Sequence, residues 1–192
     1  MKSVIAITAA FSVLLGGAAT ADTQMRMTQW FADGTNANGH SYLTRTGDKI
    51  LLTMELAGLN PGDAFTLWWV VFNTPEGCVN GCGDDEFANM DTMAAAGLAV
   101  ANATGNIVKS DGTLEFGAVL QQGVDDSSHQ ILFSTVGPVL AANPEDAEVH
   151  LVVQSHGQAR GGKKLRQQVS QFEANCTPAC ADLQFAVHPP AP

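Results

Sequence analysis

Hydrophobic and polar side chains alternate along several short segments of this chain. Every second residue is apolar in four segments, at residues 50–56, 114–120, 149–153 and 183–187. This period of two is typical of strands that bury one face. Residues 25–31 and 130–136 are weaker strand candidates, and turn formers such as Asn60-Pro61-Gly62-Asp63 separate the segments. The pattern predicts a mainly β fold, a single antiparallel β-sandwich or barrel-like domain.

One segment breaks the alternation. Residues 66–72 read TLWWVVF and are apolar at nearly every position, so a strand here needs a cover on both faces. Trp68 and Trp69 would point to opposite sides of the sheet. The favoured interpretation is that residues 74–106 fold back over the outer face. A homodimer interface or an apolar ligand cleft are the alternatives, because tryptophan is enriched at interfaces.

A helical pattern interrupts the strands. Asp84 is a predicted N-cap, apolar residues recur at helical spacing from Phe87 to Ala94, and Gly97 is a predicted stop. The sequence therefore predicts one inserted helix. A second short helix is a weaker prediction at residues 164–172.

The first 21 residues have the pattern of a secretory signal peptide. Lys2 precedes an apolar run from Val4 to Leu15, and Ala19-Thr20-Ala21 supplies a small-x-small cleavage pattern. Cleavage would leave residues 22–192 as a single domain with no segment long enough to span a membrane. We expect a secreted or periplasmic protein.

The net charge of the chain limits the kinds of molecule that we expect it to bind. Asp and Glu outnumber Lys and Arg by 19 to 9, and the net charge is −10, which argues against nucleic acid and anionic membrane surfaces as partners. The bases cluster in one loop, QARGGKKLRQQ, which contains Arg160, Lys163, Lys164 and Arg166. This loop is a candidate docking site for an anionic small molecule or glycan, and a solvated loop is the simpler interpretation.

Four cysteines lie in two close pairs. Cys78 and Cys82 bracket one short spacer, and Cys176 and Cys180 bracket another. Four cysteines allow three pairings, and the turn formers Asn80-Gly81 and Pro178 in the spacers favour the two local disulfides. A zinc site built from all four thiolates is the alternative, which an oxidising compartment disfavours.

Two histidines could bind a metal ion. His150 and His156 lie at alternate positions of one strand-like segment, as do Glu148 and Gln154, so all four side chains would face the same side. Such groups on one face could bind copper or zinc. Six residues of straight strand span roughly 20 Å, so a shared ion would need a bulge or other ligands such as His129 or His188. A polar outer face is the simpler interpretation, and no cofactor is then expected.

Four strings in the chain carry a resemblance. They are GLNPGDAFTLWWVVFNTPEGC (58–78), ATGNIVKSDGTLEFGAVLQQG (103–123), AEVHLVVQSHGQA (147–159) and LQFAVHPP (183–190). Together they resemble a group of secreted bacterial proteins with a tryptophan-rich strand and a His-Leu-Val-Val…His-Gly strand. The resemblance implies a single β domain and no particular reaction.

Enzyme signatures are mostly missing from the sequence. It contains no Gly-x-Ser-x-Gly elbow, no His-Glu-x-x-His, no phosphate loop and no dinucleotide fingerprint. The leading hypothesis is an exported, non-enzymatic protein that binds or interacts through Trp68, Trp69 and the basic loop. The alternative is a copper or zinc protein that uses His150 and His156, with redox activity as an extension.

Overall fold

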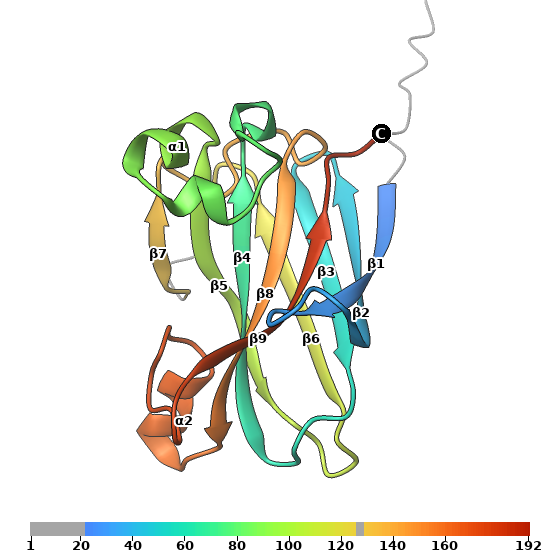
Figure 1. The fold of residues 1–192 in the computed structure, drawn as a ribbon, viewed down its shortest axis with the longest axis vertical. Helices are drawn as coiled ribbons and strands as arrows, with labels where there is room; N and C mark the ends of the chain where they lie inside the picture. Colours follow the sequence, from blue (N-terminus) through green and yellow to red (C-terminus); the bar gives the residue numbers. More distant parts are fainter. Residues whose placement is uncertain (1–21, 126–128) are drawn as a thin grey trace, which may run out of the picture.

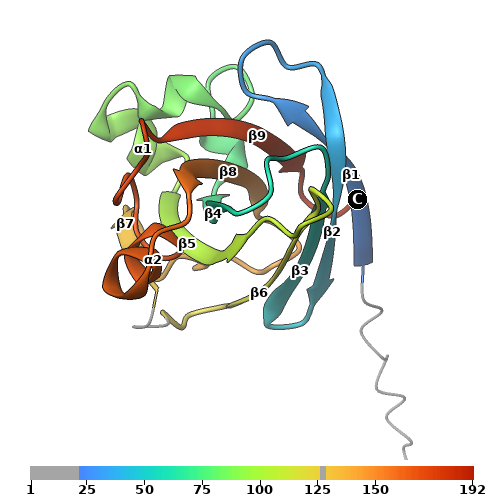
Figure 2. The same cartoon turned by 90° about the horizontal axis from the view of Figure 1, so that it is seen from below.

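The computed structural model describes residues 22–125 and 129–192 and shows one antiparallel sheet of nine strands. The sheet curls into a half-barrel that carries two short α-helices (Figures 1 and 2). Its strand order is β6-β3-β2-β1-β9-β8-β4-β5-β7. The strands are β1 (Asp22–Trp30), β2 (Asn36–Thr46), β3 (Lys49–Leu56), β4 (Asp63–Phe72), β5 (Leu98–Ile107), β6 (Leu114–Gln121), β7 (Ile131–Ser134), β8 (Glu148–Gln158) and β9 (Ala181–His188).

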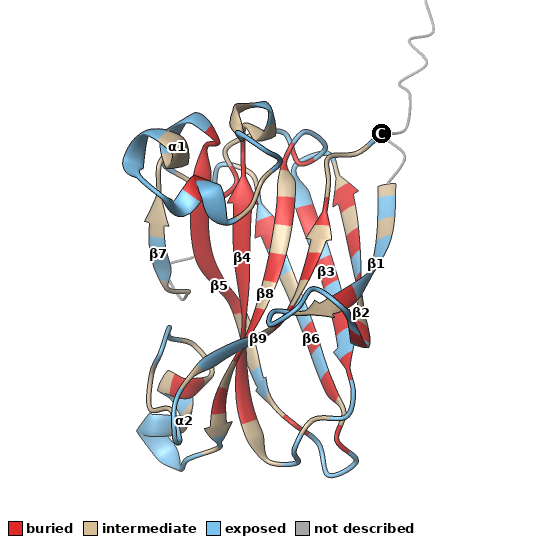
Figure 3. Ribbon diagram, in the orientation of Figure 1, coloured by how far each residue is buried: buried red, intermediate tan, exposed pale blue. Residues whose placement is uncertain are grey.

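The alternating pattern is confirmed in the strands that line the interior of the curl. In β3, every second residue from Ile50 to Leu56 is buried and its neighbours are exposed. Val149, Leu151 and Val153 of β8 are buried in the same core. Figure 3 shows this change from buried to exposed along the strands. The alternating pattern therefore predicts which face of each of these strands is buried in the core.

β4 lies in the middle of the sheet, between β8 and β5, and is buried on both faces. Leu67, Trp69 and Val71 belong to the interior core. Trp68, Val70 and Phe72 belong to a second cluster on the outer face. The prediction that this apolar strand is covered on both sides is confirmed.

The predicted cover of residues 74–106 was wrong in extent. Residues 98–107 form β5, which pairs directly with β4 over nearly its whole length. Only residues 75–97 fold over the upper part of the outer face, where Ala96 packs in the outer cluster. The lower part is covered by a segment that the sequence did not suggest, the chain after α2, whose Phe172 ring stacks edge-on against Trp68 at 5.5 Å between ring centroids.

The single inserted helix is divided in two. A 3₁₀ turn covers Asp84–Phe87, and α1 covers Met90–Ala95. The break comes at Asn89, whose side chain accepts hydrogen bonds from the backbone N–H groups of Asp91 and Thr92 and so starts a new helix. The predicted stop is confirmed, because Gly97 has a φ of +59°. The second helix, α2, covers Gly162–Gln168.

β9 orients its apolar residues unexpectedly. Gln184, Ala186 and His188 are the fully buried members of this strand, while Phe185 and Val187 line the outer face. The interior next to β9 accepts polar groups, since Ser41 Oγ lies 2.8 Å from His188 Nε2. Ser41 on β2 thus gives the buried His188 a polar partner, and the facing of β9 is the reverse of what hydrophobicity alone predicts.

The chain's C-terminal end is held by a buried arginine. The Arg45 guanidinium donates to the carbonyl oxygens of Pro144 at 2.8 Å, Ala147 at 3.1 Å and Pro189 at 2.9 Å. Burial lowers the pKa of Arg45. These bonds connect β2 to the loop before β8 and to the residues after β9.

None of the helices in the described part of the chain is both long and apolar enough to cross a membrane. The predicted signal peptide, residues 1–21, lies outside the described residues.

Candidate functional site

An apolar groove lies on the outer face of the sheet, between the residues that cover its upper and lower ends. Its volume is about 790 Å³, within the size range of small-molecule sites. Strands β4, β5 and β8 supply its floor with Trp68, Val70, Val100 and Val152. Trp68 is only 2% exposed, because the segments at the two ends of the groove cover it. The groove is the recess between these segments.

Six aromatic rings line the groove as three edge-on pairs. The centroids are 5.5 Å apart for Trp68–Phe172, 6.1 Å for Phe87–Phe133 and 5.6 Å for Phe31–Phe185. In each pair one ring is well exposed, at 43% for Phe31, 40% for Phe87 and 39% for Phe172. Exposed aromatic rings gathered around a recess are typical of ligand or partner sites.

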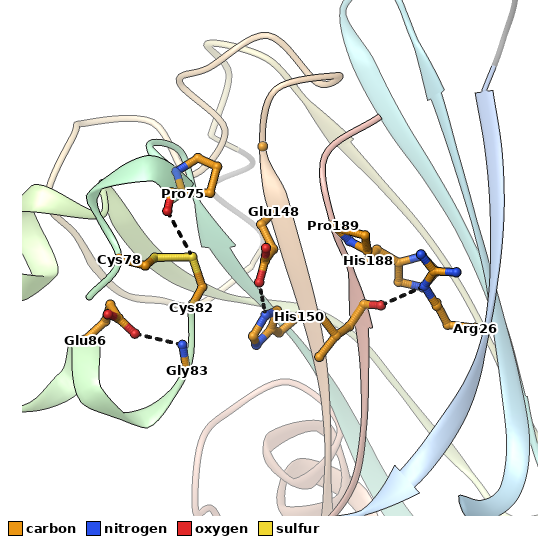
Figure 4. A network of polar contacts seen from close by, with 12 residues as sticks. Arg26, Pro75, Cys78, Cys82, Gly83, Glu86, Glu148, His150, His188 and Pro189 are labelled. Carbon is orange, nitrogen blue, oxygen red and sulfur yellow. Dashed lines mark hydrogen bonds and ion pairs between the residues drawn. A yellow bond between two sulfur atoms is a disulfide. The ribbon is translucent and has the colours of Figure 1, made fainter. Parts of the chain in front are cut away.

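The polar groups of the groove are mostly acidic. Asp84 and Asp182, both exposed residues, line it together with His150. His150 Nε2 lies 2.7 Å from Glu148 Oε1 (Figure 4). No Lys or Arg is among the described residues that line the groove. The groove therefore favours an apolar ligand with a positive charge over one with a negative charge.

His156 lies at the other end of β8 and is fully buried. Its Nε2 is 2.9 Å from the hydroxyl of Thr66, and that hydroxyl accepts a hydrogen bond from Trp68 Nε1 at 2.8 Å. Its Nδ1 is 3.0 Å from the carbonyl oxygen of Ala174. Burial lowers the pKa of His156, against smaller opposing effects of the Ala174 hydrogen bond and the Asp182 charge. Burial thus favours the neutral ring, which has a polar partner at each nitrogen.

Both predicted local disulfides are confirmed, between Cys78 and Cys82 and between Cys176 and Cys180. The first lies beside the groove, in the segment after the upper end of β4 (Figure 4). The second lies beside His156, whose partner Thr66 is near the lower end of β4. The two pairs are at opposite ends of the strand, so they do not build a four-thiolate zinc site.

The two candidate metal-binding histidines have separate surroundings. His150 is paired with Glu148 in the groove, and His156 is enclosed beneath the chain after α2. A bulge does interrupt the β8–β9 pairing, between Val153 and Gln154, but it does not bring the two rings to one site. In the described residues, the atoms of His156, Cys176 and Cys180 that could bind a metal ion all lie within 4.8 Å of one another.

The four bases of the predicted docking loop lie around the start of α2. Lys163, Lys164 and Arg166 are exposed, and Arg160 is hydrogen-bonded to the hydroxyl of Thr177. None of the four lines the groove. Lys163, Lys164 and Arg166 belong to α2, and Arg160 precedes it.

Sequence reasoning identified Trp68 but missed most of the groove. Phe31, Phe87, Phe133, Phe172 and Phe185 come from five different segments, and no spacing in the sequence connects them. Trp69 was paired with Trp68 as a candidate, but it lies in the interior core. The link between His156 and the second cysteine pair was also missed, because Cys176 and Cys180 follow His156 by 20 and 24 residues.

Comparisons with models of known protein families, with curated proteins and with solved structures found no match to this chain. The resemblance to secreted bacterial proteins therefore stays a prediction, and the chemistry of the groove and of the His156 cluster carries the functional argument.

Proposed function

We propose that this protein is an exported, non-enzymatic binding protein whose outer groove holds a small apolar molecule with a positively charged group. The observation that carries the proposal is the set of three aromatic pairs around one recess, each with an exposed ring. Exposed aromatic area is costly in water, and a ligand that covers it is stabilised by roughly 25 cal/mol for each Å² removed from water.

The acidic residues that line the groove favour a positively charged ligand. Asp84 and Asp182 supply negative charge at the groove, and the whole chain has a net charge of −10. A cation gains from these carboxylates and from the faces of the aromatic rings. A ligand with an anionic head would meet repulsion from the same groups.

The test uses three detergents with the same twelve-carbon tail, each below its critical micelle concentration: dodecyltrimethylammonium, dodecyl maltoside and dodecyl sulfate. We expect saturable one-to-one binding by calorimetry, tightest for the cation. Phe172→Ala should weaken it at least tenfold, and Asp182→Asn should weaken only the cationic detergent. Tyr42→Ala is the matched control, since Tyr42 is also an exposed ring, at 42%, but lies on β2 outside the groove.

Two outcomes would overturn the proposal. One is equal affinity for all three head groups with no effect of Phe172→Ala, which would indicate non-specific adsorption. The other is a dimer in native mass spectrometry that Phe172→Ala dissociates, which would make a second copy of the chain the occupant of the groove.

Export is the second part of the proposal. It rests on the signal-like residues 1–21 and on the two disulfides, which persist in oxidising compartments. N-terminal sequencing of protein recovered from outside the cytoplasm should begin at Asp22. Recovery of the full-length chain from the cytoplasm would contradict export and leave the groove proposal standing.

A further inference from the structure

We infer that His156, Cys176 and Cys180 form a binding site for a thiophilic d¹⁰ cation, Zn²⁺ or Cu⁺, when the Cys176–Cys180 disulfide is reduced. His156 lies near the lower end of β8, and the two cysteines lie in the chain that follows α2 and contacts it there. They do not line the apolar groove. The inference is therefore independent of the proposed ligand-binding function.

The distances suit one metal ion. His156 Nδ1 lies 3.3 Å from the sulfur of Cys180 and 3.9 Å from that of Cys176. In a tetrahedral zinc site with Zn–S near 2.3 Å and Zn–N near 2.0–2.1 Å, a nitrogen and a sulfur ligand are about 3.6 Å apart. The observed distances lie on either side of this value. Reduction need only let the two sulfur atoms move apart.

The histidine is already oriented as a metal ligand. Its Nδ1 faces the two sulfurs, and its Nε2 is held by the Thr66 hydroxyl, which is held in turn by Trp68. A hydrogen bond on the second ring nitrogen is the usual support of a metal-binding histidine, because it sets the ring orientation. Thr66 and Trp68 supply that support from β4.

The cysteine loop is attached to β8 by backbone contacts that do not involve the disulfide. Thr177 N donates to the carbonyl oxygen of His156 at 3.0 Å, and Gly157 and Thr177 form a bridge. A Cβ at position 157 would lie 1.9 Å from the Thr177 oxygen, so only glycine permits this approach. Because these contacts persist after reduction, the two thiols stay beside His156. Cys176 and Cys180 are partly exposed, so a reductant can reach them.

The chemistry balances with a dithiol as the reductant. The dithiol transfers two electrons and two protons to the Cys176–Cys180 bond, giving two thiols, and itself becomes a disulfide. The metal ion then displaces both thiol protons and binds two thiolates and the Nδ1 lone pair. The ring proton moves from Nδ1 to Nε2, so the Nδ1 bond to Ala174 is lost. Nε2 then donates to the Thr66 oxygen, whose own proton rotates away from the ring. Each metal ion bound thus releases two protons.

The first disulfide provides an internal control. The thiol atoms of Cys78 and Cys82 have no histidine in such a group within the described residues. Two thiolates and one imidazole favour soft or borderline cations, so the second pair should bind and the first should not. The variant C78S/C82S therefore removes two cysteines and keeps the site, whereas C176S/C180S removes the site.

The test reduces the full mature chain with dithiothreitol, removes the reductant without air, and adds one equivalent of Zn²⁺ or Cu⁺. Retained metal is measured after gel filtration by elemental analysis. Co²⁺ in place of Zn²⁺ reports thiolate ligation by its charge-transfer absorption. We expect one metal ion per reduced chain, none per oxidised chain, one for C78S/C82S and none for C176S/C180S. His156→Gln should weaken binding at least tenfold.

The inference is overturned if the reduced chain retains no metal, or if C78S/C82S loses as much metal as C176S/C180S. Circular dichroism of each reduced variant separates loss of the site from loss of the fold. Should His156→Gln fail to fold, the cobalt spectrum of the reduced wild-type chain still decides, since imidazole and two thiolates must both appear in it. Detergent binding to the oxidised chain is measured separately and does not depend on this result.

Discussion

The Thr66 hydroxyl lies 2.9 Å from His156 Nε2 and forms a hydrogen bond with that ring nitrogen. The Ala174 carbonyl oxygen, 3.0 Å from Nδ1, can only accept, so Nδ1 carries the proton of the neutral ring. Nε2 is then an acceptor and receives the hydroxyl proton of Thr66, while Thr66 Oγ1 accepts from Trp68 Nε1. One threonine thus connects the floor of the groove to the cysteine loop.

Replacing Thr66 by valine should destabilise the fold. The change keeps the shape of the side chain but leaves the buried Trp68 N–H and His156 Nε2 without a partner. We expect a loss of about 2–4 kcal/mol in the free energy of unfolding, measured by urea unfolding. Thr66→Ser keeps the hydroxyl and should lose much less. A valine variant within about 0.5 kcal/mol of wild type would show that the relay does not contribute to stability.

His188 should make the protein lose stability in acid. Burial, and then the positive charges of Arg45, Arg26 and His150, lower the pKa of His188 from 6.5 to about 3. The unfolded chain therefore binds a proton that the folded chain does not between these two pH values. Stability is fully present above pH 6.5 and falls as pH decreases toward 3, by up to about 1.4 kcal/mol per pH unit. Burial of His156 acts in the same direction.

Urea unfolding between pH 7 and pH 4 tests this dependence. His188→Gln should give a shallower decrease in the free energy of unfolding than wild type. His40→Gln is the comparison variant, because it removes a histidine whose side chain is 34% exposed. Equal slopes for wild type and His188→Gln would contradict the assignment.

A negative charge at position 73 should destabilise the fold. Its Nδ2 donates to the carbonyl oxygens of Gly97 at 2.9 Å and Val139 at 3.1 Å, and its Oδ1 accepts from the N–H groups of Ala141 and Ala142. In Asn73→Asp a buried carboxylate would face two carbonyl oxygens. We expect a loss of about 3 kcal/mol or more at pH 7, which becomes smaller in acid.

The exposed Asn143 provides the matched control for this substitution. Thermal unfolding should show a large decrease in Tm for Asn73→Asp and little change for Asn143→Asp. A similar small change in both would mean that the Asn73 amide is replaceable.

Two strand glycines should respond oppositely to alanine. A Cβ on Gly105 of β5 would lie 2.0 Å from the Val169 carbonyl oxygen, whereas a Cβ on Gly117 of β6 would have no neighbour closer than 3.9 Å. Gly105→Ala should displace the chain after α2 and cost about 1–3 kcal/mol. Gly117→Ala should be neutral or slightly stabilising. Urea unfolding with limited proteolysis of the α2 region measures both, and equal behaviour would contradict the close approach.

Much of the fold was predictable because strand formation leaves a local pattern. Alternation identified β3, β6, β8 and β9, and the two apolar faces of residues 66–72 identified a central strand. The prediction of a single helix around residues 84–97 was wrong. Its acids and apolar residues fit a continuous helix, and the capping geometry of Asn89 that divides it appears only once the neighbouring loop is folded.

The candidate sites were less predictable, because their residues are distant in sequence. Trp68 and Phe172 meet only because the chain after α2 returns across β4. His156 meets Thr66 because β8 pairs with β4. These contacts depend on strand order, which local patterns in the sequence do not report.

The sequence by itself determined a mainly β chain, an apolar central strand and two local disulfides, because periodicity, composition and short spacings are properties of neighbouring residues. Tertiary structure alone decided how nine strands curl, which side chains enclose the groove, and that His156 faces Cys176 and Cys180. Those features result from packing between segments far apart in the chain. The outer face of β4 is apolar and must be buried, so residues 75–97 and the chain after α2 pack over it. Both candidate sites form where these segments meet the sheet.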